Sequence, residues 1–217
     1  MNKEEIISKV ADYVKNVCEN DTTGHDWYHI QRVYKNAMLI NEKENANELI
    51  LTIIVLMHDL YDHKFFNGKI EEKLEETLKE LNIYQEFTEE ENRNIIYSCA
   101  NLGFSSNVVE RKNLSKEGQI AQDADRLDAL GAMGLARTFI YSGAKGRPMY
   151  NPEDNQQVDA KYYKEVGSKT AIGHFYDKCL KLKDLMNTQT AKEIAKHRHE
   201  FLQSYIDEFL DEWNGKK

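Results

Sequence analysis

The sequence predicts an all-α fold, and three observations carry the prediction. Only two prolines occur among 217 residues, and both stand in one short stretch. Leu, Lys, Glu and Ala, which favour helices, are plentiful. Apolar residues recur at helical spacing, and no segment alternates as a strand would. We expect one helical domain over residues 1–217.

The first three helices follow from apolar periodicity and capping residues. An amphipathic helix is expected over 3–19, and a second from Asp26, a favourable N-cap, to about residue 44. A third, over 48–61, has apolar residues at i, i+3, i+4 and i+7 and on most other faces. A helix that is apolar all round belongs in the interior, so we expect this one at the centre of the fold.

Two capping boxes and one clear loop mark the later helices that we expect. Thr88 and Glu91 form a capping box that opens one of them at residue 89. Thr190 and Glu193 open the last in the same way. Both prolines and two glycines fall in 142–154, the clearest loop. The last helix covers 189–213, and the others cover 69–81, 116–141 and 156–186.

Charge and cysteine content exclude several classes. Lys and Arg total 29 against 37 Asp and Glu, a net charge of −8, so we expect no nucleic-acid partner. Three cysteines without a C-x-x-C pattern indicate reduced thiols in a cytoplasmic protein. No signal peptide is visible at the N-terminus, and the longest apolar run is too short to span a bilayer, so we expect no membrane association.

The clearest chemical signal is His58-Asp59, at the end of the apolar helix. A buried His and Asp are costly unless they are paired, hydrogen-bonded or metal-bound. The alternative is a histidine stabilised by the helix dipole. His29 lies one turn into the preceding helix and is a further candidate ligand. His25 precedes it by four residues, the spacing of a helical zinc pair, but lies before the expected helix start.

A third group of candidate residues lies in the segment 122–128, which contains three aspartates. On a helix, Asp125 and Asp128 are about 60° apart, whereas Asp123 is about 160° from Asp125. We therefore expect Asp125 and Asp128 to share a face and Asp123 not to be a ligand. The alternative is a charged face exposed to solvent.

The order His29, then His58-Asp59, then Asp125, each on its own helix, resembles the HD superfamily of metal-dependent phosphohydrolases. Local strings strengthen the resemblance: GHDWYHIQRV at 24–33, LMHDLYDHK at 56–64 and ADRLDA at 124–129. They are similar to small bacterial HD hydrolases, some of which are nucleoside triphosphate pyrophosphohydrolases. The motifs cover about 20–140, and the helices of about 156–213 form a C-terminal extension.

The resemblance implies one divalent metal ion held by His29, His58, Asp59 and Asp125. Two imidazoles and two carboxylates suit Mn, Fe, Co, Ni or Zn, and we favour Mn. Asp62 is expected to orient or deprotonate the attacking water, because the family often has an acidic residue there. The residues expected to contact the phosphorylated substrate are Lys64, Arg126 and His25.

The resemblance also implies the reaction, hydrolysis of a nucleoside or deoxynucleoside triphosphate with release of pyrophosphate. One alternative is a phosphodiesterase or phosphomonoesterase acting on another small phosphate. Another is a non-catalytic helical module that holds the metal. The acidic Asp62 favours an enzyme, since a structural metal site would not need it. The base, the sugar, the native metal and a possible homo-oligomer stay open.

Overall fold

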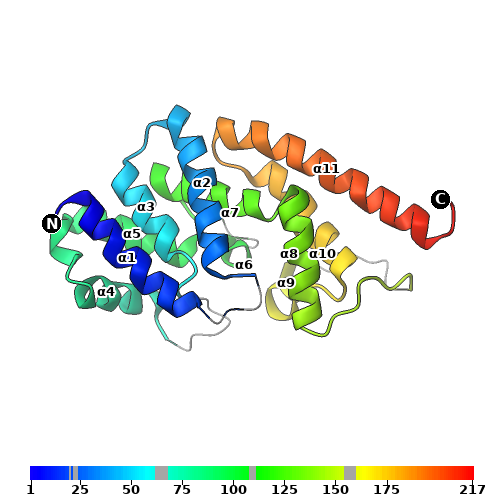
Figure 1. Cartoon of the computed structure of the whole chain (residues 1–217), viewed down its shortest axis with the longest axis horizontal. Helices are drawn as coiled ribbons and strands as arrows, with labels where there is room; N and C mark the ends of the chain where they lie inside the picture. The colour runs from blue at the N-terminus through cyan, green and yellow to red at the C-terminus, as the bar shows by residue number, and fades with distance from the viewer. Residues whose placement is uncertain (20, 22–23, 62–67, 108–110, 154–159) are drawn as a thin grey trace. The chain divides into compact units, whose positions relative to one another are not determined.

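The computed structural model describes residues 1–19, 21, 24–61, 68–107, 111–153 and 160–217, and every regular element within them is a helix. The predicted all-α class is confirmed for this part of the chain. The residues group into two compact units, Met1–Ala124 and Asp125–Lys217. The elements, labelled in Figure 1, are α1 (Lys3–Cys18), α2 (Trp27–Glu44), α3 (Glu48–Met57), α4 (Ile70–Glu80), η1 (Tyr84–Glu86), α5 (Glu89–Asn101), α6 (Phe104–Asn107), α7 (Lys116–Asp128), α8 (Gly131–Ala144), α9 (Ala160–Val166), α10 (Ala171–Asp177), η2 (Cys179–Leu185) and α11 (Gln189–Trp213).

The core of the first unit is built around α3. Every residue from Ile50 to Met57 is buried, and the helix packs against α1, α2 and α5. The predicted central position is therefore confirmed within this unit. The helix ends at Met57 and not at residue 61, and His58 is its C-cap. The backbone then tightens, because the N–H of Leu60 donates to the carbonyl of Met57.

Two of the predicted helix starts are found with their capping bonds. The side chain of Asp26 accepts the backbone N–H of His29 at the start of α2. Thr88 and Glu91 form the reciprocal capping box of α5. Such bonds satisfy amide groups that have no partner within the first turn of a helix. The sequence therefore located the starts of these two helices to within a residue.

The predicted single helix over 116–141 is wrong, because the structure has two helices there. Leu130 is extended, with φ −118° and ψ 163°, and Gly131 has φ +65°. Glycine adopts this left-handed conformation without the steric cost that a side chain imposes. A Cβ atom at Gly134 would also overlap the backbone of Ala129, so the two segments meet through small residues at this break.

The predicted helix over 156–186 is also interrupted, and its described part forms α9, α10 and η2. Gly167 follows α9 with φ +80°, and Thr170 begins α10 by accepting the N–H of Gly173. The last helix, α11, has the predicted bounds. Its N-cap is Thr188, which accepts the N–H of Ala191, and the expected cap at Thr190 is wrong.

The second unit is organised by α11, the long C-terminal helix that Figure 1 draws in orange to red. It packs against α8 and η2, and α10 contacts both of these elements. Phe139 of α8 lies edge-on to Phe175 and Tyr205, at ring-centroid distances of 5.9 and 6.2 Å. Aromatic contacts of this geometry add to the stabilisation that burial provides.

All three cysteines are buried free thiols, as the sequence predicts for reduced cysteines. Burial, with a contribution from the carboxylate of Asp59, raises the pKa of the Cys18 thiol to about 11. Burial likewise raises the pKa of Cys99 and of Cys179. None of the described helices combines the length and apolarity needed to cross a bilayer.

Candidate metal centre

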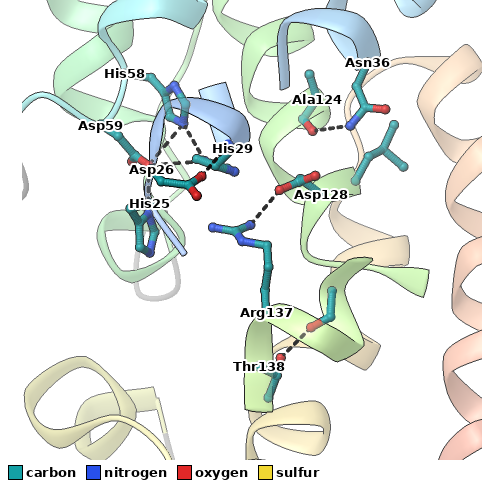
Figure 2. A network of polar contacts seen from close by, with 12 residues as sticks. His25, Asp26, His29, Asn36, His58, Asp59, Ala124, Asp128, Arg137 and Thr138 are labelled. Carbon is teal, nitrogen blue, oxygen red and sulfur yellow. Dashed lines mark hydrogen bonds and ion pairs between the residues drawn. The ribbon is translucent and has the colours of Figure 1, made fainter. Parts of the chain in front are cut away.

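Three of the predicted ligands meet within the first unit. His29 Nε2 lies 3.2 Å from Asp59 Oδ2, and His58 Nε2 lies 3.5 Å from the same oxygen. The two Nε2 atoms are 3.3 Å apart. The three side chains come from α2 and from the end of α3, and Figure 2 shows them pointing toward one another.

His29 is held by the start of α2. The side chain of Asp26 accepts the backbone N–H of His29 at 2.8 Å, so the cap of the helix also fixes the backbone of this residue. The His29 side chain is fully buried. Because capping and burial restrict both backbone and ring, His29 presents Nε2 from a rigid position.

His58 is oriented by the backbone of its own segment. Its Nδ1 lies 2.7 Å from the carbonyl oxygen of Val55. A carbonyl only accepts, so Nδ1 carries the proton, and in the neutral ring Nε2 then presents its lone pair. A metal-binding histidine almost always donates its other ring N–H in this way. The contact therefore prepares His58 Nε2 as a ligand atom.

Asp59 supplies the negative charge of the cluster. Burial raises the pKa of Asp59, but the electrostatic interaction with His58 and His25 and the hydrogen bonds from His25 and His29 outweigh burial, so that the pKa of Asp59 lies well below its usual value. The group is therefore a carboxylate at neutral pH. Histidine nitrogens gathered around one carboxylate form an environment that attracts a cation.

The spacing of these three atoms fits a divalent ion. Metal–ligand bonds to histidine nitrogen and carboxylate oxygen are about 2.0–2.2 Å long, which puts neighbouring ligand atoms about 3.0 Å apart at right angles and about 3.4 Å apart in a tetrahedron. The observed separations are 3.2, 3.3 and 3.5 Å. Two imidazoles and a carboxylate are donors that Mn, Fe, Co, Ni and Zn accept.

His25 also reaches this cluster, although it precedes the helix. Its Nδ1 lies 2.8 Å from Asp59 Oδ2, and its ring centroid is 5.5 Å from that of His29. His25, His29 and Asp59 can together offer ligand atoms within 4.8 Å of one another. The sequence argument gave the His25–His29 pair little weight because only one member is helical. The extended backbone of Asp26 lets the ring of His25 approach all the same.

The turn after His58-Asp59 is anchored by Tyr61. Its hydroxyl lies 2.8 Å from Oγ1 of Thr77 and 3.3 Å from the hydroxyl of Tyr13. These contacts tie the chain to α4 and α1 immediately after the cluster. The predicted catalytic residue Asp62 and the predicted phosphate-binding residue Lys64 follow Tyr61 and lie outside the described residues.

Helix α7 carries the other predicted residues. Asp123 is fully buried and Asp128 is 1% exposed, so the alternative of a solvated acidic face is wrong. Asp125 is the first residue of the second unit and is partly buried; its role as a ligand stays a prediction. Arg126 is buried and donates to the carbonyl of Leu185. This bond gives its guanidinium a structural partner, and phosphate binding by Arg126 also stays a prediction.

Comparison with known proteins agrees with this geometry. Residues 26–130 match the HD domain family model, and this range contains every predicted metal ligand. Bacillus subtilis YpgQ is 35% identical over 199 residues, which are 91% of this chain and 89% of that protein. A likeness of this extent establishes common family membership.

The chain belongs to the HD domain family. An HD-superfamily hydrolase from Bacillus thuringiensis is 41% identical, with a TM-score of 0.73 over 98% of this chain and 99% of that chain. A Lactobacillus plantarum protein is 33% identical, with a TM-score of 0.84 over 99% of this chain and 100% of that chain. YpgQ has also been solved in complex with ADP, and that structure gives a TM-score of 0.73. This HD protein is a hydrolase whose fold is that of metal-dependent phosphohydrolases.

Proposed function

We propose that this HD protein hydrolyses a nucleoside or deoxynucleoside triphosphate at the α-phosphorus and releases pyrophosphate. The observation that carries the proposal is the convergence of His29, His58 and Asp59 at distances that suit one divalent ion. The ADP complex of YpgQ, a relative of this chain, supports a nucleotide as the substrate class. The net charge of −8 favours a small substrate over a polyanion.

The proposed ligands are His29, His58, Asp59 and Asp125, with Mn as the favoured ion. A divalent ion bound there would lower the pKa of a water molecule and polarise a phosphoryl oxygen. His58 offers Nε2 to the ion, because its Nδ1–H is committed to the carbonyl of Val55. Asp59 contributes a full negative charge, and the bond from His25 steadies its Oδ2.

The remaining roles in the reaction are assigned to Asp62, Lys64, His25 and Arg126. Asp62 orients or deprotonates the attacking water, and Lys64 binds the negative oxygens of the phosphate chain. Such general-base assistance is worth about 10²–10⁴-fold in rate. His25 and Arg126 are further proposed substrate contacts. The cytoplasm, where nucleotides are abundant, is the proposed location.

The test is a release assay for phosphate and pyrophosphate over ribo- and deoxyribonucleotides with Mn, Mg, Co or Ni. We expect pyrophosphate from triphosphates with wild-type protein. Asp62→Asn should bind the ion as wild type does and lose most turnover, whereas His58→Ala should lose both. His197→Ala, an exposed histidine on α11, is the matched control and should change neither.

Two outcomes would contradict the proposal. Release of orthophosphate alone, from monophosphates or other small phosphate esters, would indicate a phosphomonoesterase. Turnover of no nucleotide or phosphodiester, with Asp62→Asn indistinguishable from wild type in every assay, would indicate a metal-holding module without catalysis.

A further inference from the structure

A buried amide joins the helix that carries His29 to the helix that carries Asp125. Asn36 lies on α2, seven residues after His29, and is 8% exposed. Its Nδ2 donates to the carbonyl oxygen of Ala124 in α7 at 3.2 Å (Figure 2). A polar side chain this buried costs free energy unless it is hydrogen-bonded, so its position relative to α7 is constrained.

The acceptor of this bond stands directly before Asp125. Ala124 is fully buried, and its small side chain leaves the backbone of α7 open to a close approach. Helix α7 runs without interruption from Lys116 to Asp128. In a continuous helix the direction of each Cα–Cβ bond is set by the position of the preceding peptide unit. The bond from Asn36 therefore constrains the peptide unit that immediately precedes Asp125.

We propose that Asn36 is a positioning residue of the metal centre, which acts by holding α7 at Ala124 so that Asp125 is presented to the same ion as His29. This inference rests on the proposed function, in which Asp125 is the fourth ligand. Helix α2 then has two tasks seven residues apart: it supplies one ligand and orients the helix that supplies another. Residues that orient ligands without touching the ion commonly change metal affinity by about 10–100-fold when they are replaced.

A matched pair of variants separates positioning from ordinary stabilisation. Asn36→Leu removes the bond to Ala124 and keeps the branched shape of the side chain. Asn92→Leu removes an equivalent buried amide on α5, which is 1% exposed and donates to the carbonyls of Tyr84 and Phe87 at 2.9 and 3.3 Å. Both changes should lower the melting temperature of the metal-free protein. Only Asn36→Leu should weaken Mn²⁺ binding, by about 10–100-fold in calorimetric titration of the full-length chain.

A double-mutant cycle asks whether Asn36 acts through Asp125. Asp125→Ala should itself weaken Mn²⁺ binding, and adding Asn36→Leu to it should weaken binding by no more than about twofold. Independent residues would instead give effects that add. Where Asn36→Leu does not fold, as judged by far-UV circular dichroism, Asn36→Ala is the second variant, and the same loss of Mn²⁺ affinity is expected.

The failures are distinguishable. If Asp125→Ala weakens binding but a folded Asn36 variant binds Mn²⁺ as wild type does, the positioning role is wrong and the metal centre stands. Additive effects in the cycle, or an equal loss of affinity in Asn92→Leu, also overturn the inference. If Asp125→Ala leaves affinity unchanged while His58→Ala abolishes it, both the fourth ligand and the inference are wrong. If wild-type protein binds no divalent ion, the proposed function falls and the inference falls with it.

Discussion

The carboxylate of Asp128 lies 3.0 Å from the guanidinium of Arg137, within the second unit (Figure 2). The two side chains are only 2% and 14% exposed. The buried Asp128 therefore has a largely covered cation as its partner. A buried charge that loses its partner is strongly destabilising, because water cannot replace the lost interaction.

Arg137→Met should therefore destabilise the protein by about 3 kcal/mol, since it leaves Asp128 without this ion pair. Urea unfolding followed by circular dichroism measures the change. Lys69→Met is the control, because Lys69 and Glu72 form a highly exposed pair at 2.6 Å. Exposed pairs are worth at most about 1 kcal/mol. Equal effects of the two changes would contradict the structural role given to Arg137.

Metal addition should stabilise the folded protein, because the unfolded chain has no assembled ligand set. At an Mn²⁺ concentration 100 times the dissociation constant, the expected gain is about 2.7 kcal/mol, visible as a higher melting temperature. EDTA should reverse it. His58→Ala should remove the response.

His25→Ala provides the comparison for the metal response. It should retain a clear Mn²⁺-dependent rise in melting temperature, because His25 contacts Asp59 without being a proposed ligand itself, and all four proposed ligands stay in place. A complete loss of the response in His25→Ala would identify His25 as a required ligand and contradict its proposed role in substrate binding.

The carboxylate of Glu117 links α7 to the start of α3, accepting the N–H of Asn47 at 3.1 Å and the amide of Asn94 at 3.3 Å. Partial burial raises the pKa of Glu117, but these bonds and those within its own turn outweigh burial and lower it overall. A lowered pKa means that the ionised form stabilises the fold. This contribution is present above the unfolded-state pKa and is lost as the pH falls through the folded-state pKa.

Glu117→Gln should therefore lower the free energy of unfolding by about 1 kcal/mol at pH 7, in line with the loss of charge-assisted hydrogen bonds at a partly exposed site. The difference from wild type should be smaller at an acid pH than at pH 7, because the wild-type Glu117 becomes protonated as the pH falls through its lowered pKa. Urea titrations at the two pH values measure it. A difference that persists unchanged at low pH would show that the charge of Glu117 is not the cause.

Two glycines of α8 should respond oppositely to alanine. At Gly134 a Cβ atom overlaps the backbone of Ala129, which cannot move aside as a flexible side chain could. Gly134→Ala should destabilise the protein by about 1–3 kcal/mol. At Gly143 a Cβ atom meets nothing within 4 Å, so Gly143→Ala should stabilise by up to about 1 kcal/mol. Thermal unfolding of both variants tests the pair, and destabilisation by Gly143→Ala would contradict the packing described.

The sequence predicted helices well wherever a local signal marks a boundary. Asp26 and the Thr88–Glu91 box begin their helices as expected, because a cap is a contact between residues close in the chain. The prediction failed at Gly131 and Gly167, where a left-handed residue interrupts a segment of otherwise good helix formers. A glycine inside a helical pattern can be tolerated or can end the helix, and tertiary packing decides which.

The sequence indicated the residues that meet in the candidate site better than the groups that orient them. His29, His58 and Asp59 follow from their positions on two consecutive helices. The carbonyl of Val55 and the amide of Asn36 have no sequence signature, because a backbone acceptor is present at every position and a lone Asn within a helix has many uses. The reach of His25 depends on the conformation of the residues before α2, which helical spacing does not describe.

The buried thiols make the opening of each unit separately measurable. Cys18 and Cys99 belong to the first unit and Cys179 to the second, and all three are buried in the folded chain. A thiolate must form and meet the reagent before labelling occurs, so a buried thiol with a raised pKa reacts only when its surroundings open. Alkylation followed by peptide mass spectrometry would thus give a rate for each cysteine under native conditions. Mn²⁺ should slow the labelling of Cys18, which shares the first unit with His29, His58 and Asp59, more than that of Cys179 in the second unit.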